Sequence, residues 1–174
     1  DLSPTARRAV LAAMCLALVL VVASVAMLNV ALRDIAVDLG PSQSEQQWIV
    51  DAYVLLLAAL LLPFGALGDR FGRRSALLVG IVIFGVASAV SATADSPTQL
   101  IVWRGIAGIG AALIMPGTLS TITSVFPDEE RARAVGVWAG FAGGGAVLGM
   151  IVAGALLETF WWGSIFVATA ALAV

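Results

Sequence analysis

The sequence contains no lysine and no histidine, and Cys15 is its single cysteine. A Walker phosphate loop, a histidine general base, a zinc site and a disulfide framework therefore all lack the residues on which they depend. Charged residues make up only 11% of the chain, whereas an average soluble domain has roughly 25%. The nine basic and eleven acidic residues nearly cancel, so the net charge indicates no nucleic-acid partner.

Most of the chain is apolar, with 61% hydrophobic residues and a mean hydropathy of +1.05. Uncharged stretches occupy residues 9–32, 52–68, 75–94, 105–127, 134–157 and 159–174. About 20 apolar residues in a helix cross a hydrocarbon core of roughly 30 Å, and a lipid-exposed backbone must satisfy its own hydrogen bonds. The sequence therefore predicts an all-α, polytopic membrane bundle of five to six helices.

The expected helices share apolar composition and polar or charged flanks. They lie at residues 9–32, 48–67, 75–94, 99–124, 134–157 and from about 164. Arg7 and Arg8 before the first stretch also resemble the start of a signal peptide, but this stretch is longer than a typical signal core. We expect one bundle over residues 1–174, and its apolar end at Val174 suggests an incomplete transmembrane unit.

The arginines predict the orientation of this bundle. An N-terminus on the cytoplasmic side places seven arginines inside and one, Arg33, outside, which agrees with the positive-inside rule. The inside group comprises Arg7, Arg8, Arg70, Arg73, Arg74, Arg131 and Arg133. The remaining arginine, Arg104, lies within a predicted span.

Arg104 and Asp51 are the candidate functional charges within the membrane. An intramembrane arginine costs about 2.5–3.5 kcal/mol on insertion scales and is by default functional and paired. Asp51, one turn after the interfacial Trp48, lies at a similar depth, so we expect both side chains to face the bundle interior and to pair. Burial raises the pKa of a carboxyl group, and a nearby cation lowers it. The protonation of Asp51 can therefore depend on what else occupies the cavity, which is what a proton-coupled carrier requires. The alternatives are an arginine that snorkels to the interface and a carboxylate wetted from outside.

A basic hairpin at residues 65–77 reads GALGDRFGRRSAL. Gly68 and Gly72 permit unusual backbone angles, and Asp69 can accept hydrogen bonds from backbone N–H groups at a helix start. We expect Asp69 to bond to a helix terminus or to pair with an arginine at the same membrane face. The candidate arginines are Arg73, Arg131 and Arg133.

This hairpin resembles the signature loop between helices 2 and 3 of the major facilitator superfamily, G-x-L-x-D-R-x-G-R-R-x-x-L, at every specified position. Further segments resemble the fourteen-helix drug:proton antiporters of the QacA type. They are LNVAL at 28–32, WIVD at 48–51, Arg104 with Gly108 and Gly110, ALIMPGTLS at 112–120, and GALLE at 154–158 followed by Trp162. The resemblance implies the N-terminal five to six helices of such a transporter, with the C-terminal half as an expected partner.

The resemblance also implies roles for individual residues. The positions of Asp51 and Arg104 serve proton coupling or the binding of cationic drugs. In the family, a second group of positions, all of them in this hairpin, controls the switch between inward-facing and outward-facing states. Its members are Gly65, Asp69, Arg70, Gly72, Arg73 and Arg74.

Several positions depart from the antiporter pattern. Ser24 stands where helix 1 often has an acidic residue. In helix 5, the motif G-x-x-x-G-P-x-x-G-G becomes GAVLGMIVAG at 145–154, which keeps Gly145, Gly149 and Gly154 but has Met150 in place of proline. Without the hydrogen bond that a proline removes, we expect an uninterrupted helix over 134–157. We also expect a ridge of Gly136, Gly140 and Gly144 to pack against a neighbouring helix.

These observations predict a secondary transporter of the plasma membrane that exports hydrophobic or cationic compounds in exchange for protons, by alternating access. The proton is the expected coupling ion, with no other cofactor and no metal. A facilitator or metabolite porter of the same superfamily is the first alternative, because of Ser24 and Met150. A truncated, non-transporting membrane module is the second. An enzyme is disfavoured because no cluster of His, Cys or carboxylate residues is visible in the sequence.

Overall fold

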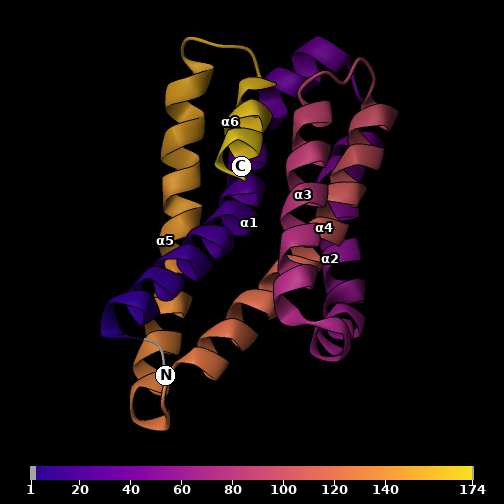
Figure 1. Cartoon of the computed structure of the whole chain (residues 1–174). Helices are drawn as coiled ribbons and strands as arrows, with labels where there is room; N and C mark the ends of the chain where they lie inside the picture. Colours follow the sequence, from indigo (N-terminus) through magenta and orange to yellow (C-terminus); the bar gives the residue numbers. More distant parts are fainter. Residues whose placement is uncertain (1–2, 174) are drawn as a thin grey trace.

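The computed structural model describes residues 3–173, which form a bundle of helices (Figure 1). The helices are α1 (Pro4–Leu39), α2 (Gln43–Phe71), α3 (Arg73–Ser91), α4 (Pro97–Val125), α5 (Asp128–Leu157) and α6 (Ser164–Leu172). The first five are long and apolar enough to cross a membrane. The predicted all-α membrane bundle is confirmed, while Val174, on which the expectation of an incomplete span partly depended, lies outside the described residues.

The predicted outer loop over residues 33–47 is wrong, because helical structure occupies most of it. α1 continues to Leu39 and stops at Gly40, whose φ of 58° is left-handed, a conformation that glycine adopts at little cost. α2 then begins directly after Ser42, which forms a capping box with Glu45. A capping box satisfies backbone donors that a helix start leaves free, so α2 begins earlier than the apolar pattern indicated.

The inner connection between α2 and α3 is also shorter than predicted. Gly68, Asp69 and Arg70 are still helical, and Gly72 alone separates the two helices. Only Gly72 has the unusual backbone angle that was expected of two glycines, with φ 108°. Gly68 instead is buried where α2 approaches α3, and a Cβ there would lie 3.5 Å from the Cβ of Ala76.

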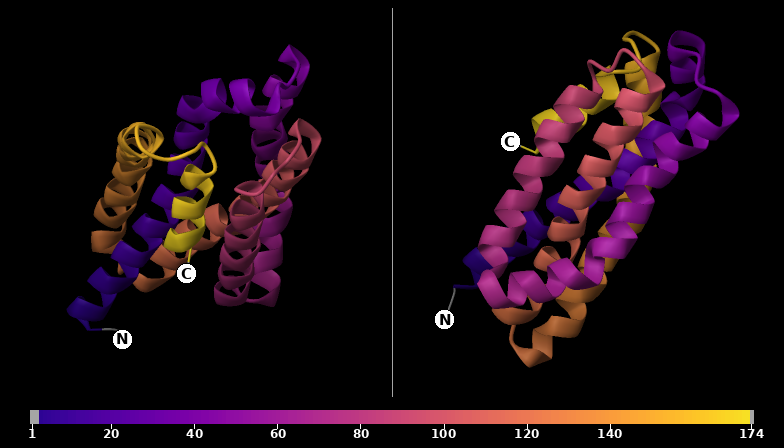
Figure 2. Two further views of the ribbon diagram at one scale, coloured as in Figure 1. Left: turned by 90° about the horizontal axis from the view of Figure 1, so that it is seen from above. Right: turned by 90° about the vertical axis from the view of Figure 1, so that its right-hand side faces the viewer.

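The helices pack in two groups that α1 and α4 join (Figures 1 and 2). α4 lies between α2 and α3, while α1 crosses the bundle beside α5, and α6 packs on α3. Glycines allow the closest approaches: a Cβ at Gly108 would lie 2.5 Å from the carbonyl oxygen of Tyr53, and one at Gly110 would lie 2.7 Å from the backbone nitrogen of Phe84. These two glycines of α4 therefore allow close approach to two different helices, α2 and α3.

α5 is one continuous helix from Asp128 to Leu157, as the absence of proline predicts. The predicted packing ridge is wrong, however. Within residues 3–173, a Cβ at Gly136, Gly140 or Gly144 would meet no atom within 4 Å, whereas one at Gly149 would lie 2.8 Å from the backbone of Ala23 in α1. Successive residues of a helix differ by about 100° in direction, and only the ridge of Gly145 and Gly149 faces α1.

Candidate functional site

Arg104 is the centre of a buried polar cluster contributed by three helices. Its side chain is 1% exposed. Nη1 donates to Ser24 Oγ in α1 at 3.0 Å, and Nε donates to the carbonyl oxygen of Ile49 in α2 at 3.4 Å. Nη2 has no hydrogen-bond partner within the described residues. The prediction that Arg104 faces the bundle interior is confirmed.

Tyr53 also compensates for this buried charge. The guanidinium carbon of Arg104 lies 4.3 Å from the centroid of the Tyr53 ring. A desolvated cation–π contact contributes on the order of 2 kcal/mol, which offsets much of the insertion cost of one arginine. The Tyr53 hydroxyl donates to the carbonyl oxygen of Val21 at 3.1 Å, so the ring is held between α1 and α4.

The expected ion pair between Asp51 and Arg104 is not formed. Asp51 is exposed on α2, and no carboxylate of the described residues lies within ion-pair distance of Arg104. Ile49 and Tyr53, which contact Arg104, each lie two positions from Asp51. Two positions move a residue only about 3 Å along a helix but turn it by about 200°, so the predicted depth was right and the predicted direction was wrong.

A groove of about 600 Å³ adjoins the Arg104 cluster and is formed by α1, α2, α4 and α5. Tyr53 belongs to both, because it lines the groove and its ring contacts the guanidinium of Arg104. The other lining residues are almost entirely apolar, with Asn29 as the main polar exception: Val21, Val22, Val25, Ala26, Asn29, Val30, Leu57, Met115, Ala146 and Met150. Such a groove suits a hydrophobic ligand that a few polar groups orient.

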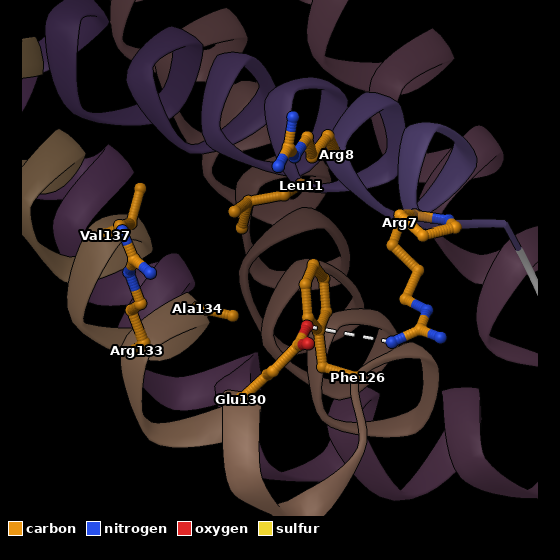
Figure 3. A pocket seen from close by; sticks show the side chains of 9 residues that line it. Arg7, Arg8, Leu11, Phe126, Glu130, Arg133, Ala134 and Val137 are labelled. Carbon is orange, nitrogen blue, oxygen red and sulfur yellow. Dashed lines mark ion pairs between the residues drawn. The ribbon is translucent and has the colours of Figure 1, made fainter.

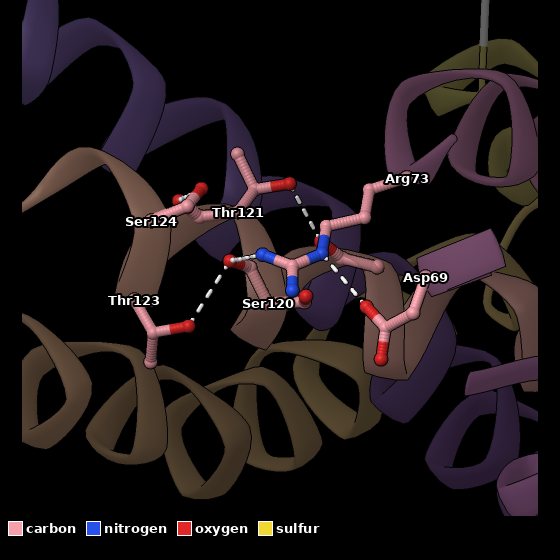
Figure 4. Close-up of polar contacts among 7 residues, drawn as sticks. Asp69, Arg73, Ser120, Thr121, Thr123 and Ser124 are labelled. Carbon is pink, nitrogen blue, oxygen red and sulfur yellow. Dashed lines mark hydrogen bonds and ion pairs between the residues drawn. The ribbon is translucent and has the colours of Figure 1, made fainter. Parts of the chain in front are cut away.

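Asp69 and Arg73 of the hairpin at residues 65–77, together with Ser120 of α4, form a polar contact between three helices that we call the bracket (Figure 4). Arg73 Nε donates to Asp69 Oδ1 at 2.8 Å, which confirms the first of the three expected arginine partners. Arg73 Nη1 also donates to the carbonyl oxygen of Ser120 in α4 at 3.0 Å. Arg131 does not reach this site, because it pairs locally with Asp128 at 2.7 Å. The bracket therefore ties the end of α2 and the start of α3 to α4.

The remaining predicted positions are spread over the bundle. Gly65 lies close to Pro116 of α4, and the guanidinium carbon of Arg70 lies 5.3 Å from the Phe71 ring centroid. Arg74 is exposed. In α5, Gly145 and Gly149 contact α1, whereas a Cβ at Gly154 would meet no atom of the described residues within 4 Å. Of these α5 positions, Met150 is the one that lines the groove.

Comparison with known families tests the resemblance that the hairpin suggests. Residues 14–174 match the family model described as Major Facilitator Superfamily. The chain belongs to this superfamily. Its fold agrees, because the crystal structure of a bacterial homologue of the human lysosomal transporter Spinster, inward-facing and unoccupied, matches with a TM-score of 0.81 at 22% identity. That alignment covers 98% of this chain and 42% of the Spinster homologue.

Curated relatives in the superfamily include named resistance transporters. The chain is 45% identical over 165 residues to the multidrug efflux pump LfrA of Mycolicibacterium smegmatis, covering 94% of this chain and 33% of LfrA. It is 44% identical over 140 residues to the methyl viologen resistance protein SmvA of Salmonella typhimurium strain 14028s, covering 80% of this chain and 28% of SmvA. The chain is therefore a multi-pass membrane segment of a transporter family and spans about a third of these relatives' length.

Sequence reasoning missed two members of the Arg104 cluster and one of the groove. Ser24 was noted only as a missing carboxylate, Tyr53 was not singled out, and Asn29 was noted only within a family motif. One signal was available: Tyr53 is the only tyrosine of the chain and lies inside a predicted span, where its hydroxyl needs a partner. Which helix would supply that partner depended on packing.

Proposed function

We propose that this major facilitator superfamily chain is the N-terminal portion of an exporter that exchanges hydrophobic or cationic compounds for protons by alternating access. The observation that carries the proposal is the apolar groove between α1, α2, α4 and α5, backed by the Arg104 and Tyr53 cluster. The names of the relatives LfrA and SmvA, a multidrug efflux pump and a methyl viologen resistance protein, support the substrate class.

In this proposal Asp51 carries the coupling proton. It is exposed on a face of α2 that also presents Leu55 and Leu62, which are 55% and 82% exposed. A carboxylate facing lipid at this depth is costly, so the remainder of the transporter or a wet cavity is expected to cover this face. Protonation of Asp51 would then depend on which side of the membrane the cavity faces.

Arg104 has a complementary role in this proposal. Its guanidinium carbon lies 4.3 Å from the centroid of the Tyr53 ring, and its Nη2 is unpartnered within the described residues. Through Ser24 and Ile49 it contacts α1 and α2 together, so a change in the relative positions of these helices must change its hydrogen bonds. We therefore assign Arg104 to the proton relay that the family resemblance implies.

The bracket of Asp69, Arg73 and Ser120 is the proposed conformational switch. An exposed ion pair contributes only about 0–1 kcal/mol, which is too small to hold the fold but enough to bias an equilibrium between two transporter states. The positive-inside rule supports our proposal that the arginine-rich end of the bundle lies in the cytoplasm, with the chain in the plasma membrane and its N-terminus inside.

A facilitator or metabolite porter is the second candidate function. It is favoured by one observation: Arg104 bonds to the hydroxyl of Ser24 where an antiporter of this type often has a carboxylate.

Proteoliposomes containing the complete transporter distinguish these functions. We expect an outward gradient of a cationic dye to drive proton movement in the opposite direction, measured with a pH-sensitive dye in the lumen. Dye flux without any proton movement would favour the facilitator. No flux from the complete protein for any cationic or neutral substrate would contradict the export proposal.

A further inference from the structure

A second cavity, of about 520 Å³, lies at the arginine-rich end of the bundle (Figure 3). It is bounded by the first turns of α1 and α5 and by the connection from α4. Its lining residues are Pro4, Arg7, Arg8, Leu11, Phe126, Glu130, Arg133, Ala134 and Val137. None of these residues belongs to the groove or to the Arg104 cluster.

The charges around this cavity are unbalanced in favour of an anion. Arg7 Nη1 lies 3.7 Å from Glu130 Oε2, and these two side chains approach one another on one side of the cavity in Figure 3. Arg8 and Arg133, both exposed, line the same cavity and make no ion pair within residues 3–173. Among the described residues that line the cavity, three carry a guanidinium group and one carries a carboxylate. The start of α1 adds the positive end of a helix with no acidic residue in its first turn.

An apolar groove of about 340 Å³ continues from the basic cavity along α1 and α5. The two spaces share Arg8, Leu11 and Val137. Beyond these, the groove is lined only by apolar or weakly polar side chains: Ala12, Cys15, Leu16 and Phe141. Within the described residues, the Leu16 and Phe141 side chains that line this groove are 65% and 44% exposed.

A basic cavity that continues into an apolar groove fits a ligand with an anionic head group and an apolar chain. We propose that the cleft between α1 and α5 binds an anionic phospholipid, with its phosphate between Arg8 and Arg133 and an acyl chain along Leu16 and Phe141. The level in the membrane agrees, because the uncharged stretches of α1 and α5 begin directly after these two arginines. Basic pockets between transmembrane helices at this level bind anionic lipid head groups. The proposal is independent of the transported substrate and of proton coupling.

Lipid binding to the complete, delipidated transporter in an uncharged detergent tests this proposal. The probes are palmitoyl-oleoyl phosphatidylglycerol, the matching phosphatidylcholine, and soluble glycerol phosphate, with binding measured by titration in native mass spectrometry. The variants are Arg8→Gln with Arg133→Gln, and Val137→Trp, which narrows the apolar groove without changing charge. Arg33→Gln is the matched control, since it removes an exposed arginine from the other end of α1.

We expect wild type to prefer phosphatidylglycerol over phosphatidylcholine. Each arginine near the membrane surface is expected to contribute about fivefold in affinity, so the double variant should bind phosphatidylglycerol about 25-fold more weakly. Arg33→Gln should bind as wild type does. Val137→Trp should weaken the binding of both lipids. If the double variant does not fold, the single variants are each expected to show the fivefold loss.

Three outcomes would overturn the proposal. The first is equal wild-type affinity for the two lipids, and the second is unchanged phosphatidylglycerol binding in the arginine variants. The third is glycerol phosphate binding as tightly as phosphatidylglycerol, with Val137→Trp without effect, which would identify a site for soluble anions.

Discussion

Among single residues, Asp51 combines an exposed position on α2 with a depth near that of the Arg104 contact to Ile49. Because the side chain points away from Arg104, its proton affinity depends on what covers that face of α2 in the complete transporter. We expect Asp51→Asn to abolish proton-coupled export while expression stays near wild type. Asp34→Asn is the control, since Asp34 is an exposed carboxylate near the end of α1. Proton-coupled export of every cationic substrate in Asp51→Asn would assign Asp51 to a wetted interface.

Arg104 is the second residue with a separable role. Burial of a charged group is costly, and an apolar side chain of similar volume removes that cost together with the hydrogen bonds to Ser24 and Ile49. Arg104→Met should therefore abolish coupled transport while the melting temperature in detergent stays the same or rises.

Tyr53→Phe is the matched variant for Arg104→Met. It keeps the ring that faces the guanidinium and loses only the hydrogen bond to Val21, which costs about 1 kcal/mol. Transport should persist in this variant. A large loss of stability in Arg104→Met, with Tyr53→Phe unaffected, would show that the arginine is mainly a structural link between helices.

Helix α5 shows how two glycine ridges of the same helix differ in importance. Gly149 contacts the backbone of Ala23, whereas Gly144 is exposed. A β-branched side chain at Gly149 must push α1 and α5 apart, and overpacking of this kind typically costs about 1–3 kcal/mol. Gly149→Val should lower the melting temperature of the complete transporter in detergent, and Gly144→Val should leave it unchanged. The reverse order would show that the other ridge forms the principal helix contact.

The junction of α2 and α3 is the element in which a weak interaction is expected to have a large functional effect. Asp69 and Arg73 are 59% and 41% exposed, so their ion pair adds little stability. We expect Asp69→Asn to change the transport rate by a large factor while thermal stability shifts by less than about 1 kcal/mol. Asp128→Asn removes a similar local pair with Arg131 in α5 and should leave transport unchanged. Wild-type transport rates in Asp69→Asn would refute the switch.

For the whole molecule, the helix order predicts the side of the membrane on which each connection lies. The start of α1, the α2–α3 turn and the α4–α5 connection lie at one end of the bundle (Figure 1). In a Cys15→Ala background, an impermeant maleimide added to intact cells should label Thr98→Cys, at the exposed start of α4, and should not label Glu129→Cys, at the exposed start of α5. Labelling of Glu129→Cys alone would reverse the proposed orientation.

Local sequence signals determined much of this protein. Long uncharged stretches fixed an all-α membrane bundle, because a backbone in lipid must bond to itself. The hairpin motif at residues 65–77 indicated the superfamily, and the absence of proline at position 150 predicted the continuity of α5. These features depend on composition and on neighbours in the chain. The helix ends at Leu39 and Gln43 were missed only because Gly40 and the capping box of Ser42 were overlooked.

Tertiary structure alone decided which side chains meet. Two residues at one depth in the membrane point in directions set by helix rotation, so Asp51 faces outward while Ile49 and Tyr53 contact Arg104. The direction of the α5 glycines was equally undetermined by the sequence. Both glycine ridges consist of equally small residues, but only the ridge of Gly145 and Gly149 contacts α1. A strongly apolar helix gives little indication of its buried face, because lipid and protein interior are similar in polarity. The groove beside Tyr53 and the basic cavity at the start of α1 and α5 arise from the packing of whole helices, which no single segment encodes.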